Sequence, residues 1–483
     1  MSINEQMRGL ILDNFGFQPT PEQENAVEMM ADFILEQERE TMFLLKGYAG
    51  TGKTSLVGAL VRSLDQLKQR TVLMAPTGRA AKVFSLYAHH TAYTIHKRIY
   101  RQKAFTGDMT GFTQGVNLLK HTLFIVDEAS MISNDGLSSH VFGTGRLLDD
   151  LIQFVYSGEG CRLMLVGDTA QLPPVGEELS PALDAEELAG YGMKVHEITL
   201  TEVVRQLSGS GILRNATTLR QLIVDDEMWA FPQLQLKQFA DIMSLPGTEL
   251  LEALEQAYSQ CGTDQTIVIT RSNARANIYN NGIRARILDY DAELTGGDQL
   301  MVVKNNYHWV KPQVTEEQDT TQMDFIANGD IATIRRFRNE RSEHGFRFAD
   351  VTLIFPDYED MEVDATIVLD TLASEAPALT QQQQETLFQK VWDDYPELTN
   401  KRDRMKAVKE DPYFNALQIK YAYAITCHKA QGGQWQRVFI DQGFITEEQL
   451  SPDYFRWLYT ALTRATEKVY LVNWPTAESD EDI

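Results

Sequence analysis

The sequence predicts an α/β protein with two parallel-sheet units and a small β-barrel inserted into the second unit. An apolar strand over residues 42–45 leads into a glycine-rich loop and then into a segment with helical spacing, 55–64. Apolar strands alternate with helical segments up to residue 199 and again from residue 266. From residue 299 short strands and turns replace this alternation for about a hundred residues, as is typical of a small barrel.

Length and charge limit the class of protein. A chain of 483 residues is too long for one ordinary core and favours two to four domains. The net charge of −24, from 44 basic and 68 acidic residues, would normally argue against a nucleic-acid partner, but much of the acid lies in local blocks. Any groove for a polyanion must therefore be local, and its affinity should depend steeply on salt.

The same composition indicates the compartment. The three cysteines are far apart and lack CxxC spacing, which argues against a disulfide framework and against a zinc site. The first seventeen residues lack the basic start and apolar core of a signal peptide, and no stretch is long enough to span a membrane. We expect a soluble protein of the reducing cytoplasm, without a membrane partner.

Residues 47–54, GYAGTGKT, form a phosphate-loop motif between a strand and a helix. Backbone N–H groups can close around a triphosphate only where no Cβ obstructs them, and the next helix adds its positive dipole end. In such a loop Lys53 reaches the β and γ phosphates and Thr54 binds Mg²⁺. The predicted nucleotide-binding residues of the loop are Gly47, Ala49, Gly50, Thr51, Gly52, Lys53, Thr54 and Ser55.

The rest of the first unit follows in order. A helix over 18–38, with Gln23 near its start, precedes the loop, and a strand over 71–75 leads through APTGRAAK into another helix. Residues 91–100 combine hydroxyl groups with His96 and Lys97, a mixture suited to phosphate contacts. Residues 101–120 predict an inserted hairpin with Phe105 and Phe112 on either side of its turn, and strands follow at 122–126, 161–166 and 195–199.

In the second unit, a strand over 266–270 precedes a polar helix over 271–284. We expect helix over 381–410, buried strands over 419–425 and 437–441, a helix over 455–466 and a last strand over 468–473. The predicted domain segments are 1–100 and 121–200 for the first unit, 101–120 for the hairpin, 201–298 and 416–483 for the second unit, and 299–415 for the barrel with its helical extension.

Two acids follow the strand over 122–126. Asp127 can hold Mg²⁺, and Glu128 can orient and deprotonate an attacking water. Gln171 can sense the γ-phosphate. Arginines brought across a domain cleft, here Arg205 and Arg464, can neutralise charge on the transferring phosphoryl group, an effect of ~10³–10⁵ in rate. Together these residues predict an ATPase that acts when two lobes close.

Seven ordered motifs carry a family resemblance across residues 23–466: GYAGTGKT, APTGRAAK, DEAS, VGDTAQLPPVG, TEVVRQ, TCHKAQGGQW and YTALTRA. The chain resembles the superfamily 1B DNA helicases, closest in pattern to RecD-like and Dda-like enzymes, with PIF-type helicases as relatives. The resemblance implies two RecA-like P-loop lobes, a β-hairpin pin in the first and a small Src-homology-type barrel in the second. It also implies ATP-driven 5′-to-3′ movement along single-stranded DNA by a monomeric motor that unwinds duplex DNA.

The same resemblance implies roles for particular residues. Gln23 would contact adenine, and Lys53, Glu128, Gln171, Arg205 and Arg464 would serve hydrolysis, with Mg²⁺ on Thr54 and Asp127. The residues that would contact single-stranded DNA or its junction with duplex are Thr77, Gly78, Arg79, His96, Lys97, Phe105, Phe112, Thr426, His428 and Lys429. Gln434 departs from the pattern, because relatives often carry a glutamate there.

Two other functions share parts of this pattern. A remodelling ATPase could strip proteins from single strands without separating base pairs, and only the hairpin argues against it in the sequence. An AAA-type oligomeric switch shares the phosphate loop and the acid pair. Such a switch normally has one α/β lobe and takes its arginine from a neighbouring subunit, whereas a second lobe of this chain supplies Arg464.

Overall fold

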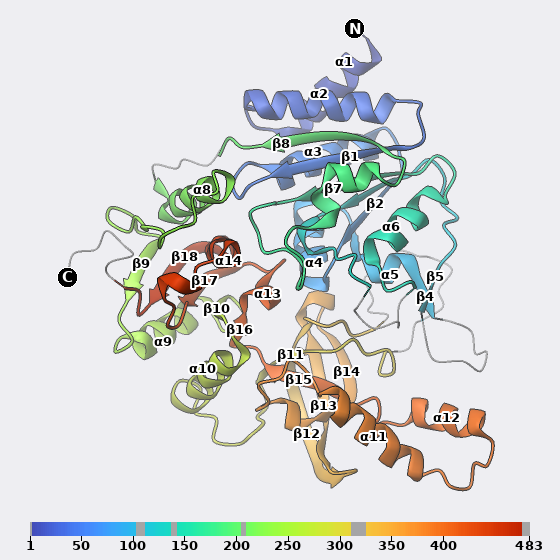
Figure 1. Cartoon of the computed structure of the whole chain (residues 1–483), viewed down its shortest axis with the longest axis vertical. Helices are drawn as coiled ribbons and strands as arrows, with labels where there is room; N and C mark the ends of the chain where they lie inside the picture. Colours follow the sequence, from blue (N-terminus) through green and yellow to red (C-terminus); the bar gives the residue numbers. More distant parts are fainter. Residues whose placement is uncertain (1, 103–111, 137–142, 204–208, 311–324, 476–483) are drawn as a thin grey trace.

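The computed structural model places two α/β lobes side by side, with a β-barrel beneath their junction (Figure 1). It describes residues 2–102, 112–136, 143–203, 209–310 and 325–475. Among these residues, none of the helices combines the length and the apolar character needed to cross a membrane.

The first lobe contains a six-stranded parallel sheet in the order β3-β2-β6-β7-β1-β8. The strands are β1 (Thr41–Gly47), β2 (Thr71–Ala75), β3 (Ala92–Thr94), β6 (Leu123–Val126), β7 (Arg162–Gly167) and β8 (Lys194–Leu200). Because β6, β7 and β1 are neighbours, the loops that follow them meet at one edge of the sheet. This topology brings three of the predicted motifs together.

Alternate side chains of β1 pack against helices on opposite faces of the sheet. Phe43 and Leu45 join the apolar cluster of α1, α2 and α3, whereas Met42 and Leu44 face the cluster that contains α6. The elements around the sheet are α1 (Ile3–Phe15), α2 (Pro21–Leu35), α3 (Lys53–Gln66), α4 (Gly78–Ala88), α5 (Ile95–Ile99), α6 (Leu147–Tyr156), α7 (Ala185–Ala189), η1 (Ala129–Met131) and η2 (Pro181–Leu183). Helix α1 is absent from our sequence prediction.

The predicted hairpin has its two strands, β4 (Tyr100–Gln102) and β5 (Phe112–Gln114), paired antiparallel. The turn between them, with Phe105, lies outside the described residues.

The second lobe contains a parallel sheet in the order β16-β10-β17-β18-β9. Its strands are β9 (Ile242–Leu245), β10 (Thr266–Thr270), β16 (Ala424–Thr426), β17 (Trp435–Asp441) and β18 (Ala465–Val472), and its helices are α8 (Gly211–Val224), α9 (Leu250–Cys261), α10 (Asn273–Arg286), α13 (Cys427–Ala430), α14 (Pro452–Leu462) and η6 (Glu447–Gln449). Our sequence prediction lacks the edge strand β9, whose four residues include only three apolar side chains. The helix predicted over 455–466 ends at Leu462, and the last strand begins earlier than predicted.

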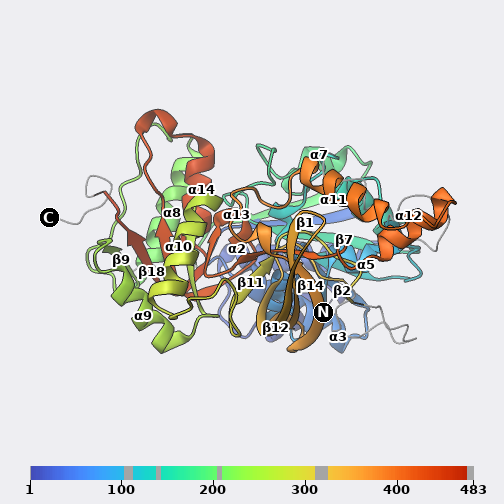
Figure 2. The same ribbon diagram turned by 90° about the horizontal axis from the view of Figure 1, so that it is seen from below.

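A closed five-stranded barrel interrupts this lobe between α10 and β16. Its elements are β11 (Gln299–Val302), β12 (Ile331–Glu343), β13 (Phe346–Phe355), β14 (Met361–Val368) and β15 (Leu417–Tyr421), with η4 (Pro356–Tyr358) and η5 (Leu369–Thr371). Figure 2 shows α11 (Gln381–Asp393) and α12 (Lys401–Glu410) extending to one side of it.

Two predictions in this region are wrong. The single strand predicted over 419–425 is divided: β15 pairs with β11 and closes the barrel, past the predicted barrel end at 415, and only β16 joins the second sheet. A continuous apolar run cannot indicate where a chain changes sheet. The single helix predicted over 381–410 is two helices, and Pro396 lies in the segment between them.

Candidate functional site

The loop between β1 and α3 has the shape that a phosphate group requires. Gly50 and Gly52 adopt left-handed backbone conformations, with φ of 80° and 84°. A Cβ at Gly47 would lie 2.9 Å from Thr51 Oγ1 and 3.0 Å from the Lys53 side chain, so the loop leaves no space for one. These glycines therefore form a cradle suited to close contact between backbone N–H groups and a phosphate.

Lys53 begins α3, and its amino group points back into the loop. Nζ donates to the carbonyl oxygens of Gly47, at 2.7 Å, and Tyr48, at 2.9 Å. Thr54 follows in the first turn and is partly exposed. A lysine and a hydroxyl group thus lie side by side at the helix start, where anions are favoured.

Gln23 supports the loop from α2. Its Nε2 donates to the Thr51 carbonyl oxygen at 2.9 Å, and its Oε1 accepts from the Thr20 N–H at 3.0 Å in a capping box. The side chain is 1% exposed. We expected the Gln23 amide to contact adenine. In this structure its nitrogen and its oxygen both bind backbone groups of the chain.

The acid pair lies at the end of β6. Glu128 has a φ of 53°, uncommon for a residue with a side chain, and its N–H donates to Asp127 Oδ1 at 2.8 Å. Burial, followed by the neighbouring charge of Glu128, raises the pKa of Asp127, and the charge of Lys53 opposes this rise. The pair and the lysine are therefore close enough to interact electrically.

Gln171 and Asp168 follow β7. Gln171 is 8% exposed, and its Oε1 has no hydrogen-bond partner among the described residues. Asp168 is buried and accepts from the Ala170 N–H at 2.9 Å and from the Tyr459 hydroxyl at 2.6 Å. A buried amide oxygen without a partner, at the edge that holds the acid pair, is suited to bind a ligand group.

Helix α14 of the second lobe packs against this edge. Arg464, just past its end, is 4% exposed and has Nη1 3.9 Å from Glu128 Oε1. Thr460 Oγ1 accepts from the Leu172 N–H at 2.9 Å, and Arg456 donates to the Thr169 carbonyl oxygen. The second predicted arginine, Arg205, lies outside the described residues.

A second group of predicted residues lies where α4 meets the second lobe. Thr77 caps α4 by accepting from the Ala80 N–H at 3.2 Å, and a Cβ on Gly432 would lie 3.2 Å from Thr77 Oγ1. Arg79 lies 4.0 Å over the Trp435 ring and donates to the Gln434 carbonyl oxygen at 3.0 Å. Burial lowers the pKa of Arg79. Its side chain joins the lobes, a contact that the sequence did not predict.

The remaining predicted cations differ in charge and position. Burial lowers the pKa of His96 to about 4, so this ring is neutral at pH 7. Burial also lowers the pKa of His428, and it lowers the pKa of Lys429 to about 8. Lys429 donates to Asn328 Oδ1 of the segment before β12, and Thr426 ends β16 beside it. Phe112 begins β5.

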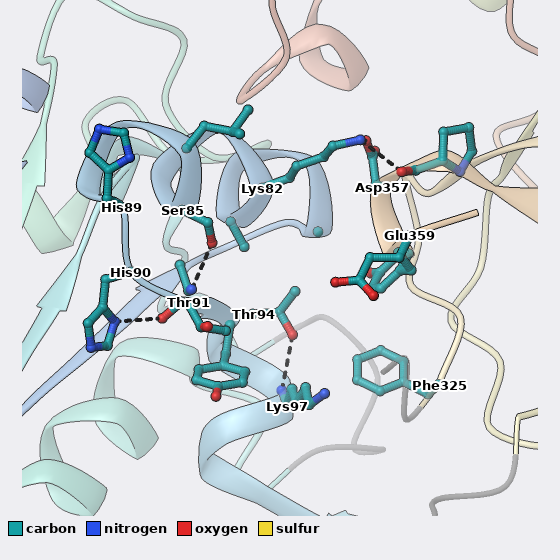
Figure 3. A pocket seen from close by; sticks show the side chains of 17 residues that line it. Lys82, Ser85, His89, His90, Thr91, Thr94, Lys97, Phe325, Asp357 and Glu359 are labelled. Atoms are coloured by element: carbon teal, nitrogen blue, oxygen red, sulfur yellow. Dashed lines mark hydrogen bonds and ion pairs between the residues drawn. The ribbon is translucent and has the colours of Figure 1, made fainter. Parts of the chain in front are cut away.

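A cavity of 560 Å³ lies between the first lobe and the barrel (Figure 3). Helix α4 contributes Gly78, Lys82 and Ser85, α5 contributes Lys97, and the barrel side contributes Asp357 among others. Lys82 closes one end by donating to the Pro356 carbonyl oxygen at 2.8 Å and pairing with Asp357 at 3.2 Å. Gly78 and Lys97, two predicted DNA contacts, therefore line one cavity.

Sequence reasoning missed Asp168 and Tyr459 as site residues. Asp168 follows a buried strand as Asp127 does, and that position was a usable signal. Tyr459 lies in a predicted motif, but only the packing of α14 shows where its hydroxyl group points.

Comparison with known proteins covers both lobes. Residues 18–228 match the AAA domain family, and residues 421–472 match the UvrD-like helicase C-terminal domain. The chain is 22% identical to an uncharacterized protein of Acanthamoeba polyphaga mimivirus, over 92% of this chain and 98% of that one. It is 23% identical to the ATP-dependent RecD2 DNA helicase of Deinococcus radiodurans, over 92% of this chain but only 48% of the relative.

A solved structure of Pif1 helicase from Bacteroides, in complex with ADP-AlF3 and ssDNA, aligns with 97% of this chain and 93% of its own. Its sequence identity is 16% and its TM-score 0.46. The two domain matches, in this order, and the likeness to RecD2 make the chain similar to the superfamily 1B helicases of the RecD-like type.

Proposed function

We propose that the chain is an ATP-dependent DNA helicase that moves 5′-to-3′ along single-stranded DNA and unwinds duplex DNA as it hydrolyses ATP. The observation that carries this proposal is the contact between the two lobes at the edge of the first sheet. The phosphate loop, the acid pair and Gln171 come from the first lobe, and Arg464 reaches Glu128 from the second. An arginine supplied by the second lobe makes hydrolysis depend on how the lobes meet.

The residues at this edge fit ATP and Mg²⁺. The glycine cradle and Lys53 suit the phosphates, and the Thr54 hydroxyl and the Asp127 carboxylate are hard oxygen ligands that suit the ion. When bound, Mg²⁺ would neutralise charge on the β and γ phosphates. Residues 47–55 and Gln23 form the proposed nucleotide site. To contact adenine, the Gln23 side chain would leave the Thr51 carbonyl oxygen to which it now donates.

Each catalytic side chain has one proposed task. Lys53 leaves the two loop carbonyl oxygens and binds the phosphates, and Glu128 orients the attacking water and accepts its proton. The unpartnered Gln171 Oε1 contacts the reacting centre, and Arg464, with Arg205, stabilises the charge that develops on the transferred group. Arg464 is 3.9 Å from Glu128, so a small closing movement brings it to the reacting group.

We propose that single-stranded DNA crosses both lobes on the side of α4 and α13. Gly78 and Lys97 line one cavity, and Thr77 lies beside Gly432 of the second lobe. With Thr426 and Lys429 of the second lobe, they supply hydroxyl groups, a backbone N–H and local positive charge. His96 and His428 would hydrogen-bond rather than carry charge, and Arg79 would hold the lobes together beside the strand. Such a local track is compatible with a net charge of −24.

Three further parts of the proposal concern the working molecule. The hairpin, with Phe105 or Phe112, would part the duplex at the junction of single and double strands. One chain supplies both lobes, which suits a monomeric motor. The three cysteines, none of them in a disulfide, are compatible with the reducing cytoplasm.

Unwinding of matched duplexes that carry either a 5′ or a 3′ single-stranded tail tests this function. We expect strand separation with ATP on the 5′-tailed duplex, little on the 3′-tailed one, and none with Lys53→Ala. Preference for the 3′ tail would overturn the direction. DNA-stimulated ATPase that displaces a bound protein from either tail, without unwinding, would instead establish the remodelling function.

A further inference from the structure

Tyr459 connects the two lobes at the phosphate loop. Its hydroxyl group, on α14 of the second lobe, accepts from the Ala49 N–H at 2.9 Å and donates to Asp168 Oδ2 at 2.6 Å. Ala49 follows β1 and Asp168 follows β7, two neighbouring strands of the first lobe. We propose that Tyr459 is a positioning residue, which fixes α14 against the phosphate loop and thereby sets where Arg464 meets Glu128.

The chemistry of the three groups makes this arrangement well defined. Tyr459 is 1% exposed and Asp168 is 2% exposed. Burial raises the pKa of Tyr459, so the hydroxyl keeps its proton and donates it toward the carboxylate. Its lone pair then faces the Ala49 N–H. The second oxygen of Asp168 accepts from the Ala170 N–H at 2.9 Å, which anchors the carboxylate to its own loop.

The proposed catalytic arginine, Arg464, follows the end of the same helix. Thr460, next to Tyr459, accepts from the Leu172 N–H, and Arg464 follows five residues after Tyr459 with Nη1 3.9 Å from Glu128 Oε1. Helix α14 and the residues just past it thus contact the loops after β1, β7 and β6, three adjacent strands. Because the helix is rigid, a shift at Tyr459 moves Arg464 relative to the acid pair.

The tip of the phosphate loop also contacts α8 of the second lobe. The Arg220 guanidinium lies 4.5 Å over the Tyr48 ring, and a Cβ on Gly50 would lie 3.1 Å from the Leu213 side chain. Tyr48 and Ala49 both pack against the apolar core of that lobe. These apolar and cation–π contacts are not strongly directional. The hydrogen bond between the Ala49 N–H and the Tyr459 hydroxyl is directional, and it fixes the position of the phosphate loop relative to α14.

Loss of the hydroxyl should therefore affect turnover more than nucleotide binding. Tyr459→Phe keeps the ring and the packing of α14, but leaves the Ala49 N–H and Asp168 Oδ2 without this partner. Tyr459 makes none of the proposed contacts with the triphosphate or the water. Lys53 and the glycine cradle remain, so ATP still binds, while Arg464 loses its fixed approach. The inference rests on the proposed ATP hydrolysis, but it does not require duplex unwinding.

The experiment compares Tyr459→Phe with Tyr454→Phe in the full chain. Tyr454 lies on the same helix, is 1% exposed, and its hydroxyl donates to Gln442 Oε1 of the same lobe at 2.7 Å. We expect Tyr459→Phe to lower the kcat of DNA-stimulated ATP hydrolysis by roughly 10- to 100-fold, with KM within about threefold of wild type. Tyr454→Phe should keep kcat within about threefold of wild type.

Two further variants make the test decisive. Tyr459→Phe combined with Arg464→Ala should be no slower than Arg464→Ala alone, because both changes act through one arginine. Asp168→Asn keeps Tyr459 but weakens the hydrogen bond that its hydroxyl group donates. It should give the same fall in kcat at unchanged KM. This variant replaces Tyr459→Phe in the test if Tyr459→Phe does not fold. A kcat within about threefold of wild type, or a multiplied loss in the double variant, would overturn the inference. Absence of any ATPase in the wild type would overturn the proposed function instead.

Discussion

Lys53 and Glu128 are proposed to act on different parts of the reacting triphosphate and water. Lys53 is a flexible cation that now binds two carbonyl oxygens of its own loop. Glu128 has a strained backbone, with a φ of 53°, and its carboxylate lies 3.9 Å from the Arg464 guanidinium. We therefore propose that Lys53 governs affinity for the triphosphate and that Glu128 governs its cleavage.

We expect Lys53→Ala and Glu128→Gln both to abolish DNA-stimulated ATPase, but in different ways. Lys53→Ala removes a charge that binds the phosphates, so ATP affinity should fall. Glu128→Gln keeps the shape of the side chain but cannot accept a proton, so ATP should bind without being cleaved. Binding of a fluorescent ATP analogue, measured beside turnover, separates the two. Equal loss of binding in both variants would contradict these roles.

Arg464 should matter for turnover rather than for binding to the first lobe. We expect Arg464→Ala to lower the rate of ATP hydrolysis by ~10³-fold or more, or ~4 kcal/mol, while ATP affinity changes little. Arg437→Ala is a matched control, because this arginine also belongs to the second lobe but pairs with Glu467. Turnover of Arg464→Ala within about threefold of wild type, under ~1 kcal/mol, would show that the cleft assignment is wrong.

At the level of elements, the barrel contacts the first lobe where α4 begins. The Tyr358 hydroxyl donates to the Asp330 carboxylate, with distances of 3.2 and 3.3 Å to its two oxygens, and both residues press against Gly78. A Cβ on Gly78 would overlap the hydroxyl group of Tyr358 and lie 2.9 Å from Asp330 Oδ1. Glycine is needed here for close approach.

We expect Gly78→Ala to destabilise the protein by ~1–3 kcal/mol, because the new methyl group overpacks this contact. Tyr358→Phe removes the hydroxyl that the methyl group meets, so the double variant should recover part of the loss. Gly282→Ala, in α10 with no atom within 4 Å of the new Cβ, is the control and should be neutral or stabilising. Urea unfolding of the wild type and of the four variants measures these changes. If the changes in the free energy of unfolding from Gly78→Ala and Tyr358→Phe were strictly additive, the proposed contact between the two positions would be wrong.

Asp330 should give this contact a pH dependence. Burial, followed by the charge of Asp357, raises its pKa to about 7, although the Ala327 N–H and Tyr358 hydroxyl bind its carboxylate. The folded state holds this proton more tightly than the unfolded state, whose carboxyl titrates near ~4. The contribution of Asp330 to stability is therefore full at low pH and decreases as pH rises from ~4 to about 7.

Asp330→Asn should remove that decrease. Relative to the variant, the free energy of unfolding of the wild type should fall between pH 5 and pH 7 by up to ~1.4 kcal/mol per pH unit. Urea unfolding of both proteins at pH 5, 6, 7 and 8 measures the difference. A constant difference across this range would contradict the raised pKa.

At the scale of the whole molecule, the tasks that we propose for the lobes and for the hairpin are separable. Two lobes that close on ATP can pull a single strand, but separating base pairs requires a surface against which the duplex end breaks. Stacking of an aromatic ring on a base contributes ~1–3 kcal/mol. One DNA base-pair step is worth ~1.4 kcal/mol on average, so a single ring could decide unwinding.

We expect alanine at Phe105 or at Phe112, whichever contacts the duplex, to reduce unwinding sharply while ATPase and single-strand translocation persist. The three rates, measured on each single variant, decide the matter. Intact unwinding in both variants would assign the hairpin a structural role. Parallel loss of ATPase and unwinding would indicate a folding defect.

The sequence by itself determined the elements whose signals are local. A glycine-rich loop between an apolar strand and a helix, and an acid pair after another strand, depend on neighbours in the chain, so both were predictable. The barrel was predictable from its short strands and turns. Its helical extension was wrongly predicted as one helix, although Pro396 lies in the break.

Only the tertiary structure decided what depends on partners distant in the sequence. It showed that β15 closes the barrel, that Arg79 stacks on Trp435, and that burial makes His96 neutral. It also revealed the bonds from Tyr459 to Ala49 and Asp168, which span 410 and 291 residues of chain. Side-chain charge and direction at such contacts follow from packing between lobes, and no local pattern in the sequence records that packing.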